Sequence, residues 1–219
     1  HIQQIKTAEE LSDLAELADS WNRLAKDVPF LSWDWLEAWW RHYARPANIG
    51  DCSIKLFTLA VRDNAGRLIG LAPWYLDSSR WHGAMLRFLG TVGVCSDYLS
   101  VLCEPGREEE VTSAMSDWLT NEARGQWDLI ELEGVDAADS VARQFAWQME
   151  SRWSTLDQRP GPHCWRLHLP SDWDSYLGTL SKSHRKQVRQ LERRAFETGR
   201  AVLRTVECEQ DLSEALKIL

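Results

Sequence analysis

The fold class is decided by residues 54–76, IKLFTLAVRDNAGRLIGLAPWYL. Two runs rich in β-branched and other apolar residues, 54–62 and 67–76, flank the turn sequence Asp63-Asn64-Ala65-Gly66. Such a pattern predicts two antiparallel strands joined by a tight turn. Pro73 has no backbone N–H to donate to a neighbouring strand, so we expect an edge or a bulge in the second strand.

Helical periodicity and further strand-like runs surround this hairpin. Thr7 to Glu10 has the form of a capping box, and Ser32 is placed to cap a second helix. The periodicity predicts helices over residues 8–25, 33–43, 108–123 and 137–152, and further strands over residues 84–89, 97–102, 127–132 and 163–169. This order of elements predicts an α/β (α+β) fold with a mixed sheet flanked by helices.

A domain boundary is expected near Pro170. After it we expect one long helix over residues 172–198, one strand over 201–206 and a helix that begins at Gln210. We therefore expect residues 1–170 to form one domain and residues 171–219 to form the start of a second, incomplete one. An incomplete domain leaves apolar surface open, so we expect some self-association.

Composition and charge exclude several classes of protein. The net charge is −8, but residues 182–204 contain eight basic and two acidic residues, a net +6 that leaves −14 for the rest. A generally acidic chain with one basic helix does not favour nucleic-acid binding. No apolar run is long enough for a membrane helix, and the N-terminus has no signal-peptide pattern, so we expect a cytoplasmic protein without membrane insertion.

The cysteines and tryptophans favour packing over chemistry. The five cysteines are scattered without CxxC spacing, which is typical of free thiols, and a metal site at His163, Cys164 and His168 lacks a second ligand pair. We expect no metal. Trp33, Trp35, Trp39 and Trp40 either form an aromatic surface for sugars or an acyl chain, or fill the core, and the i, i+4 spacing of Trp35 and Trp39 favours the core.

Several short segments, in this order, resemble a known family. The sequence is similar to the core of the GNAT N-acyltransferases, and more closely to the CelD-like tandem-GNAT family of bacterial proteins, which is related to the FemABX peptidyltransferases. The matching segments are PFLS (29–32) leading into Trp35, LIGLAP (68–73), LRFLG (86–90), SDYL (96–99), WDL (127–129) and LSKSHRK (180–186).

The resemblance implies two GNAT-like units and transfer of an acyl group from acyl-CoA, such as acetyl-CoA, to an amine. It points to exopolysaccharide or cell-envelope biosynthesis, with a small-molecule, glycan or peptidoglycan-precursor acceptor. The family binds the CoA pyrophosphate at a glycine-rich loop between a strand and a helix. The equivalent residues 103–110 contain one glycine, one proline and four carboxylates. We therefore expect a degenerate first unit, no acyl-CoA binding by this chain, and no catalysis by this chain alone.

Asp97 and Tyr98 are the candidate site residues of the first unit. In the related FemABX enzymes an acidic residue in this region faces the substrate cleft, so the resemblance implies that Asp97 positions or deprotonates the acceptor amine, with Tyr98 beside it. The alternative is structural, because Asp commonly caps or turns the chain before a strand.

A basic stripe is the candidate site of the second unit. Lys182, Lys186, Arg189 and Arg193 follow helical spacing on one face, and Arg185 lies in the segment that best matches the family. Such a stripe could bind a phosphate, a nucleotide-sugar or an anionic glycan. Alternatively it is a solvated helix face that offsets an acidic domain.

Two rival functions remain open. One is a FemABX-like aminoacyl transferase that uses aminoacyl-tRNA, and the other is a non-catalytic scaffold of a polysaccharide-synthesis complex. The sequence contains no G-x-S-x-G, Walker or dinucleotide fingerprint, so hydrolase, NTPase and dehydrogenase functions are not indicated.

Overall fold

The computed structural model describes residues 2–5, 11–26, 28–44, 53–91, 93–152, 155–163, 165 and 167–217. The chain divides into two compact units, His1–Pro162 and His163–Leu219. The first unit contains the sheets, and the second is helical in its described residues.

The first unit begins with a short strand and two helical segments. Strand β1 (Ile2–Ile5) precedes a 3-10 helix (Leu11–Leu17) that continues into α1 (Ala18–Ala25). After a 3-10 turn, α2 (Trp33–Trp39) continues into a π-helical turn (Trp40–Ala44). The Oγ of Ser32 accepts a hydrogen bond from the Trp35 N–H at 3.3 Å, which confirms the predicted cap and the start of the second helix.

The predicted hairpin is present, but each of its strands is split in the middle. The strands are β2 (Ser53–Leu56), β3 (Thr58–Arg62), β4 (Leu68–Ala72), β5 (Trp74–Ser79) and β6 (Gly83–Phe88). The splits fall at Phe57 and at Pro73, where the Phe57 N–H still donates to the Trp74 carbonyl oxygen at 3.0 Å. At Pro73, where a bulge or an edge was predicted, the chain instead passes from one sheet, which contains β4, to another, which contains β5.

Two four-stranded sheets result from these splits. With β7 at Leu102–Cys103 and β8 at Leu129–Ile130, the first sheet has the order β1-β3-β4-β7 and the second has the order β2-β5-β6-β8. All pairs are antiparallel except β6 and β8 (Leu129–Ile130), which are parallel. Together with α3 (Glu108–Asn121) and α4 (Ser140–Arg152), the mixed second sheet confirms the α/β class.

The strand predicted over residues 97–102 is wrong. Only β7 (Leu102–Cys103) pairs with the sheet, against Leu71 and Gly70 of β4. Residues 97–101 are irregular because their backbone bonds go elsewhere, as the Leu99 N–H shows by donating to the Gly134 carbonyl oxygen at 3.0 Å. The strand predicted over 127–132 is likewise reduced to the two residues of β8.

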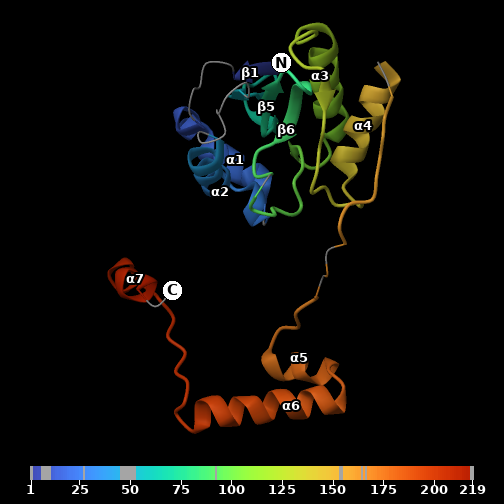
Figure 1. Cartoon of the computed structure of the whole chain (residues 1–219). Coiled ribbons are helices and arrows are strands. Elements are labelled where there is room, and N and C mark those ends of the chain that lie inside the picture. Colours follow the sequence, from blue (N-terminus) through green and yellow to red (C-terminus); the bar gives the residue numbers. More distant parts are fainter. Residues whose placement is uncertain are drawn as a thin grey trace. The chain divides into compact units, whose positions relative to one another are not determined.

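Helices cover the strands on two sides, with α1 and α2 on one and α3 and α4 on the other (Figure 1). On the α3 side, a Cβ built on Gly70 would lie 2.4 Å from Cγ1 of Val111, so only glycine allows this close approach. On the α1 side, Nη2 of Arg23 donates to the Leu68 carbonyl oxygen at 2.6 Å. Every residue of β4 is therefore buried.

Tryptophans fill much of this core. Trp33, Trp39 and Trp40 are buried, and Trp35 is half-buried. The ring of Trp33 packs edge-on against Trp21, with centroids 5.3 Å apart. The core interpretation of the tryptophan-rich helix is confirmed.

The second unit contains α5 (Trp173–Thr179), α6 (Lys182–Glu192), a π-helical turn (Arg193–Glu197) and α7 (Glu209–Leu216). The continuous helix predicted over 172–198 is wrong. Leu180 is extended (ψ 153°), and Ser181 caps a new helix by accepting from the His184 N–H at 3.3 Å.

The strands predicted over 163–169 and 201–206 are also wrong. The described residues of these two segments form no strand, because no neighbouring strand supplies backbone partners to them. Their apolar side chains are exposed, including Trp165, Leu167 and Leu203. Within the described residues, no helix is both long and apolar enough to cross a membrane.

Candidate functional site

An interruption of one strand is the most distinctive feature of the first unit. Phe88 of β6 pairs with Trp74, the Leu89 N–H donates to the Pro73 carbonyl oxygen, and Leu102 of β7 pairs with Leu71. Strands β6 and β7 therefore pair in one continuous register with β5 and β4, which follow each other in the chain. One residue opposite Ala72 would be enough to join β6 to β7, but the chain has twelve residues there, 90–101. We call residues 90–101 the excursion; its residue 92 lies outside the described residues.

Contacts on both sides hold the excursion in place. From α2, the Trp35 indole Nε1 donates to Ser96 Oγ at 3.0 Å. From the segment after β8, the Gly134 carbonyl oxygen accepts from the Leu99 N–H at 3.0 Å, and the Leu99 side chain is fully buried. These contacts attach Ser96 and Leu99 of the excursion to the rest of the first unit.

The excursion places Asp97 between two residues with unusual backbone angles. Cys95 and Tyr98 have φ values of +50° and +59°. A left-handed conformation is uncommon for a residue with a side chain, and for a bulky aromatic it costs of order 1–2 kcal/mol. Asp97 and Tyr98 are both half-buried, and both have interactions with neighbouring groups. The structure thus brings these two candidates together in an irregular segment, not on a strand.

A stack of aromatic rings adjoins the excursion. The ring of Tyr75 lies 5.3 Å from Trp39, and Trp39 stacks on Tyr43 at 6.3 Å. The Thr91 hydroxyl donates to the Phe88 carbonyl oxygen (2.7 Å), so the 3.2 Å contact between the Tyr75 and Thr91 hydroxyls has Tyr75 as donor. Burial raises the pKa of Tyr75. Sequence reasoning missed Tyr75 because no local signal links it to Thr91, sixteen residues away.

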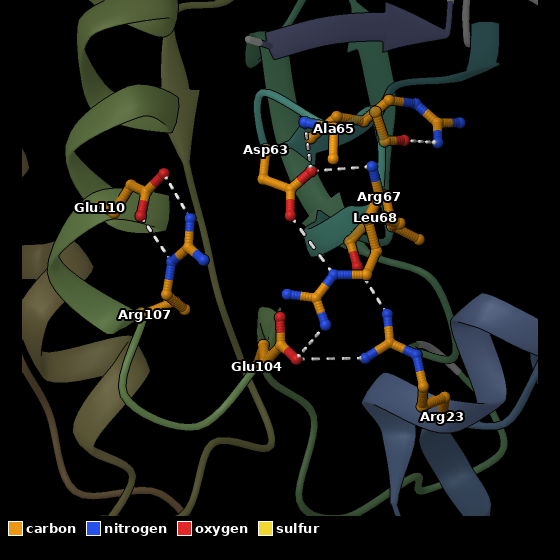
Figure 2. A network of polar contacts seen from close by, with 10 residues as sticks. Arg23, Asp63, Ala65, Arg67, Leu68, Glu104, Arg107 and Glu110 are labelled. Atoms are coloured by element: carbon orange, nitrogen blue, oxygen red, sulfur yellow. Dashed lines mark hydrogen bonds and ion pairs between the residues drawn. The ribbon is translucent and has the colours of Figure 1, made fainter.

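The loop between β7 and α3 is the place where the resemblance puts a CoA site. Figure 2 shows Glu104 between two arginines, with its Oε1 2.9 Å from Arg67 Nη1 and 3.7 Å from Arg23 Nη1. Arg107 donates to both carboxylate oxygens of Glu110, at 2.6 and 2.8 Å, and this bond holds the pKa of Glu110 below its ordinary range.

The backbone of this loop is already hydrogen-bonded. The Glu104 N–H donates to the Ile69 carbonyl oxygen at 2.9 Å, and the Arg107 N–H donates to the Glu104 carbonyl oxygen at 3.1 Å. The Gly106 N–H donates to the Glu108 carboxylate at 3.1 Å, so a side-chain anion occupies the donor that a phosphate would need. These residues do not fit a pyrophosphate.

The basic candidates lie in the second unit. Lys182, Lys186 and Arg189 are exposed on α6, and Nη2 of Arg189 lies 3.7 Å from Asp174 Oδ1. Arg185 differs from them, because its Nη2 donates to the Leu180 carbonyl oxygen at 3.1 Å and lies 3.5 Å from that of Gly178. It therefore stabilises the turn between α5 and α6.

In the described part of the chain, no group of three or more His, Cys, Asp or Glu side chains is arranged to hold a metal ion. Of the three residues considered from the sequence as metal ligands, His163 and His168 are described, and Cys164 lies outside the described residues.

No protein-family model matches this chain, and none of the curated proteins matches it. Among solved structures, it is similar to a probable acetyltransferase, with 16% identity over 76% of this chain and 99% of the other, and a TM-score of 0.41. It is also similar to ribosomal-protein-alanine N-acetyltransferase from Brucella melitensis biovar Abortus 2308, with 16% identity over 73% and 99% of the two chains and a TM-score of 0.36. What this chain binds is therefore inferred from its own residues.

Proposed function

We propose that this chain forms the amine-acceptor part of a GNAT-type N-acyltransferase that acts in exopolysaccharide or cell-envelope biosynthesis. The observation that carries the proposal is the excursion, which interrupts a strand otherwise in register and holds Asp97 beside Tyr98. A strained, anchored segment inserted into a sheet is typical of a functional element.

In this proposal Asp97 is the general base and Tyr98 contacts the acceptor. The acceptor nitrogen forms a C–N bond with the acyl carbon while the bond from that carbon to the CoA sulfur breaks. The proton of the nitrogen passes to the Asp97 carboxylate, and the sulfur leaves as a thiolate. Acyl-CoA supplies the acyl group as a thioester.

The donor is not expected to bind at residues 103–110. The Gly106 N–H already donates to Glu108, and Glu104 is held by Arg23 and Arg67. We therefore expect this chain alone to bind no acyl-CoA and to be inactive in acyl transfer.

The basic stripe is proposed, separately from the excursion, to bind an anionic group such as the phosphate of a nucleotide-sugar or of a peptidoglycan precursor. Lys182, Lys186 and Arg189 are exposed and separated by three or four residues, which places them on one face of α6. Arg185 is proposed to position α6, which carries the stripe, because its guanidinium donates to backbone carbonyl oxygens at the end of α5.

Amide NMR titrations of this chain test the proposal. Glucosamine is the amine probe, glucose is its matched control without an amine, and acetyl-CoA is the donor probe. We expect glucosamine, and not glucose, to shift the amides of residues 93–98, and we expect Asp97→Asn to abolish that shift. Asp34→Asn, an exposed carboxylate on α2, should leave the shift unchanged.

Other outcomes separate the rival functions. A shift of residues 103–110 with acetyl-CoA would overturn our interpretation of that loop. No response to glucosamine or acetyl-CoA would favour the scaffold, and binding of aminoacyl-tRNA by the basic stripe would favour an aminoacyl transferase.

A further inference from the structure

Strands β6 and β8 run side by side only briefly before their chains part. The last pair in their parallel register is Leu86 with Ile130, and the Glu131 N–H donates to the Leu86 carbonyl oxygen at 2.9 Å. If this register continued, Gly90 would lie opposite Gly134. Part of the excursion lies between these two glycines instead.

The Leu99 side chain fills the space between the two glycines. A Cβ built on Gly90 would lie 3.5 Å from Leu99 Cδ2, and a Cβ built on Gly134 would lie 3.5 Å from Leu99 Cδ1. Leu99 is fully buried, and its N–H donates to the Gly134 carbonyl oxygen at 3.0 Å. At Gly134 the excursion therefore supplies a backbone partner in place of β6. We call residues 96–99 the wedge.

Ser96 is the other point of contact of the wedge. Its Oγ accepts a hydrogen bond from Trp35 Nε1 at 3.0 Å and would lie 3.2 Å from a Cβ built on Gly90. Its carbonyl oxygen would lie 3.0 Å from a Cβ built on Gly134. Contacts this close leave little room for a side chain at either glycine, so the two glycines allow the wedge to enter between them.

Backbone strain opposes the insertion of the wedge. Cys95 directly precedes the wedge and Tyr98 lies within it, and their φ values of +50° and +59° are left-handed. Such conformations are sparsely populated for residues with a side chain and persist where surrounding contacts impose them. The burial of Leu99 and the hydrogen bonds to Trp35 and Gly134 stabilise the inserted state, whereas release of the strain favours withdrawal.

We propose that the wedge is a displaceable element that exchanges between the inserted state of this structure and a withdrawn state, and that its insertion sets the position of Asp97. In the inserted state, the contacts of Ser96 and Leu99 hold the chain on both sides of Asp97. In the withdrawn state, Leu99 leaves the two glycines, the Trp35 N–H loses Ser96, and Asp97 is no longer held.

The link to Asp97 rests on the proposed function. An acceptor amine that binds Asp97 only in the inserted state shifts the equilibrium towards insertion. Binding of the acceptor then suppresses withdrawal of the wedge, and a substitution that favours withdrawal weakens the binding.

Hydrogen exchange of the wild-type chain, followed by NMR at several urea concentrations below the unfolding transition, tests the wedge without any ligand. The Leu99 amide and the Trp35 indole N–H report on its two ends. The Phe57 amide, which donates to the Trp74 carbonyl oxygen at 3.0 Å, reports on the core. We expect one shared opening at Leu99 and Trp35, about a hundredfold more frequent than at Phe57 and little affected by urea, because a local opening exposes little surface. Exchange of Leu99 at the rate and with the urea dependence of Phe57 would overturn the wedge.

Gly134→Ala should favour the withdrawn state, because its Cβ would meet the Ser96 carbonyl oxygen. Gly125→Ala is the matched control, since the φ of Gly125 is +83°, close to the +76° of Gly134, and a new Cβ there has open space. Both variants carry a left-handed alanine. Opening at Leu99 relative to Phe57 should become about tenfold more frequent in Gly134→Ala and stay unchanged in Gly125→Ala.

Leu99→Ala gives a second test if Gly134→Ala does not fold. It removes the side chain that fills the space between the glycines, so opening at the Trp35 indole N–H should become more frequent relative to Phe57. Equal effects of Gly134→Ala and Gly125→Ala, or no effect of Leu99→Ala at Trp35, would overturn the wedge.

The wedge and the proposed function fail separately. We expect saturating glucosamine, and not glucose, to slow the exchange of Leu99 and Trp35 relative to Phe57. If Leu99 opens locally but glucosamine leaves residues 93–98 unchanged, the wedge stands and the acceptor role of Asp97 is wrong. If glucosamine shifts residues 93–98 but Leu99 opens only with the core, the acceptor role stands and the wedge is wrong. Binding of glucosamine without any change in opening would overturn the link between the wedge and Asp97.

Discussion

The indole Nε1 of Trp35 donates a 3.0 Å hydrogen bond to Ser96 Oγ, and this bond joins α2 to the excursion across 61 residues of sequence. Ser96 is buried, and the Gly90 backbone packs beneath it against Leu36. The bond is thus a direct link between the tryptophan-rich core and the segment that carries Asp97.

We expect Ser96→Ala to loosen the excursion without unfolding the first unit. Loss of a partly buried hydrogen bond costs about 1 kcal/mol, and the Trp35 N–H is left without its acceptor. Hydrogen exchange of residues 93–99 should become about fivefold faster. Trp35→Phe should give a similar effect, and the double variant should be little worse than either single one. Fully additive effects would mean that the two side chains act independently.

Gly70→Ala tests the contact between the first sheet and α3. The new Cβ would lie 2.4 and 2.7 Å from the two γ carbons of Val111, so β4 or α3 must move. We expect a loss of about 1–3 kcal/mol in the free energy of unfolding, measured by urea denaturation. Adding Val111→Ala should cost less than the sum of the two single changes. Gly161→Ala, where the new Cβ has open space, should stay within about 0.5 kcal/mol of wild type.

Cys103 should be far less reactive than the exposed Cys95. Burial raises the pKa of the Cys103 thiol to about 12, so at pH 8 only about one molecule in ten thousand carries the thiolate. We expect a variant retaining only Cys103 to react with a disulfide reagent at least about a hundredfold more slowly than one retaining only Cys95. Equal rates in the folded proteins would contradict the burial of Cys103.

Stability should fall on acidification, in part through Asp63. The backbone N–H of Arg67 donates to Asp63 Oδ1, and this bond holds the pKa of the carboxyl below its ordinary value. The unfolded chain therefore takes up this proton first, and the stabilisation is lost as the pH falls below the ordinary pKa of about 4. Asp63→Asn should be less stable than wild type at pH 6, and the difference should shrink by pH 3. A difference that is independent of pH would show that the charge of Asp63 has no part in it.

Arg185 and Lys186 are neighbours with different roles in the second unit. Arg185→Gln removes donors to the Leu180 and Gly178 carbonyl oxygens, so we expect the amides of α5 to exchange about fivefold faster. Lys186→Gln removes an exposed charge and should leave this exchange unchanged. Equal effects of the two substitutions would argue against a positioning role for Arg185.

Elements with local chemical signals could be predicted from the sequence. Asp63 and Gly66 specify their turn, because Asp63 accepts from two nearby backbone N–H groups and Gly66 has a φ of +80°. Ser32 specifies the start of α2 in the same way. The four helices of the first unit were expected on such signals and on apolar periodicity, and all four are present.

Elements that depend on distant partners could not be predicted. The alternation in residues 97–102 favours a strand, but Trp35 and Gly134 hold residues 96 and 99 in an irregular path. Residues 163–169 have a strand-like pattern and no partner in the described chain. In the same way, Asp77, Arg87 and Glu131 are too far apart in sequence for their ion pairs to be predicted. Only the pairing of β5, β6 and β8 brings them together.

The continuous register of β6 and β7 has a consequence for how this fold can change. Since eleven of the twelve residues 90–101 are surplus to the strand, the sheet itself does not specify their number or sequence. The exposed and half-buried positions 93–95, 97 and 98 can therefore vary while β4 and β5 keep their pairing, whereas the buried Ser96 and Leu99 are constrained by their contacts with Trp35 and Gly134.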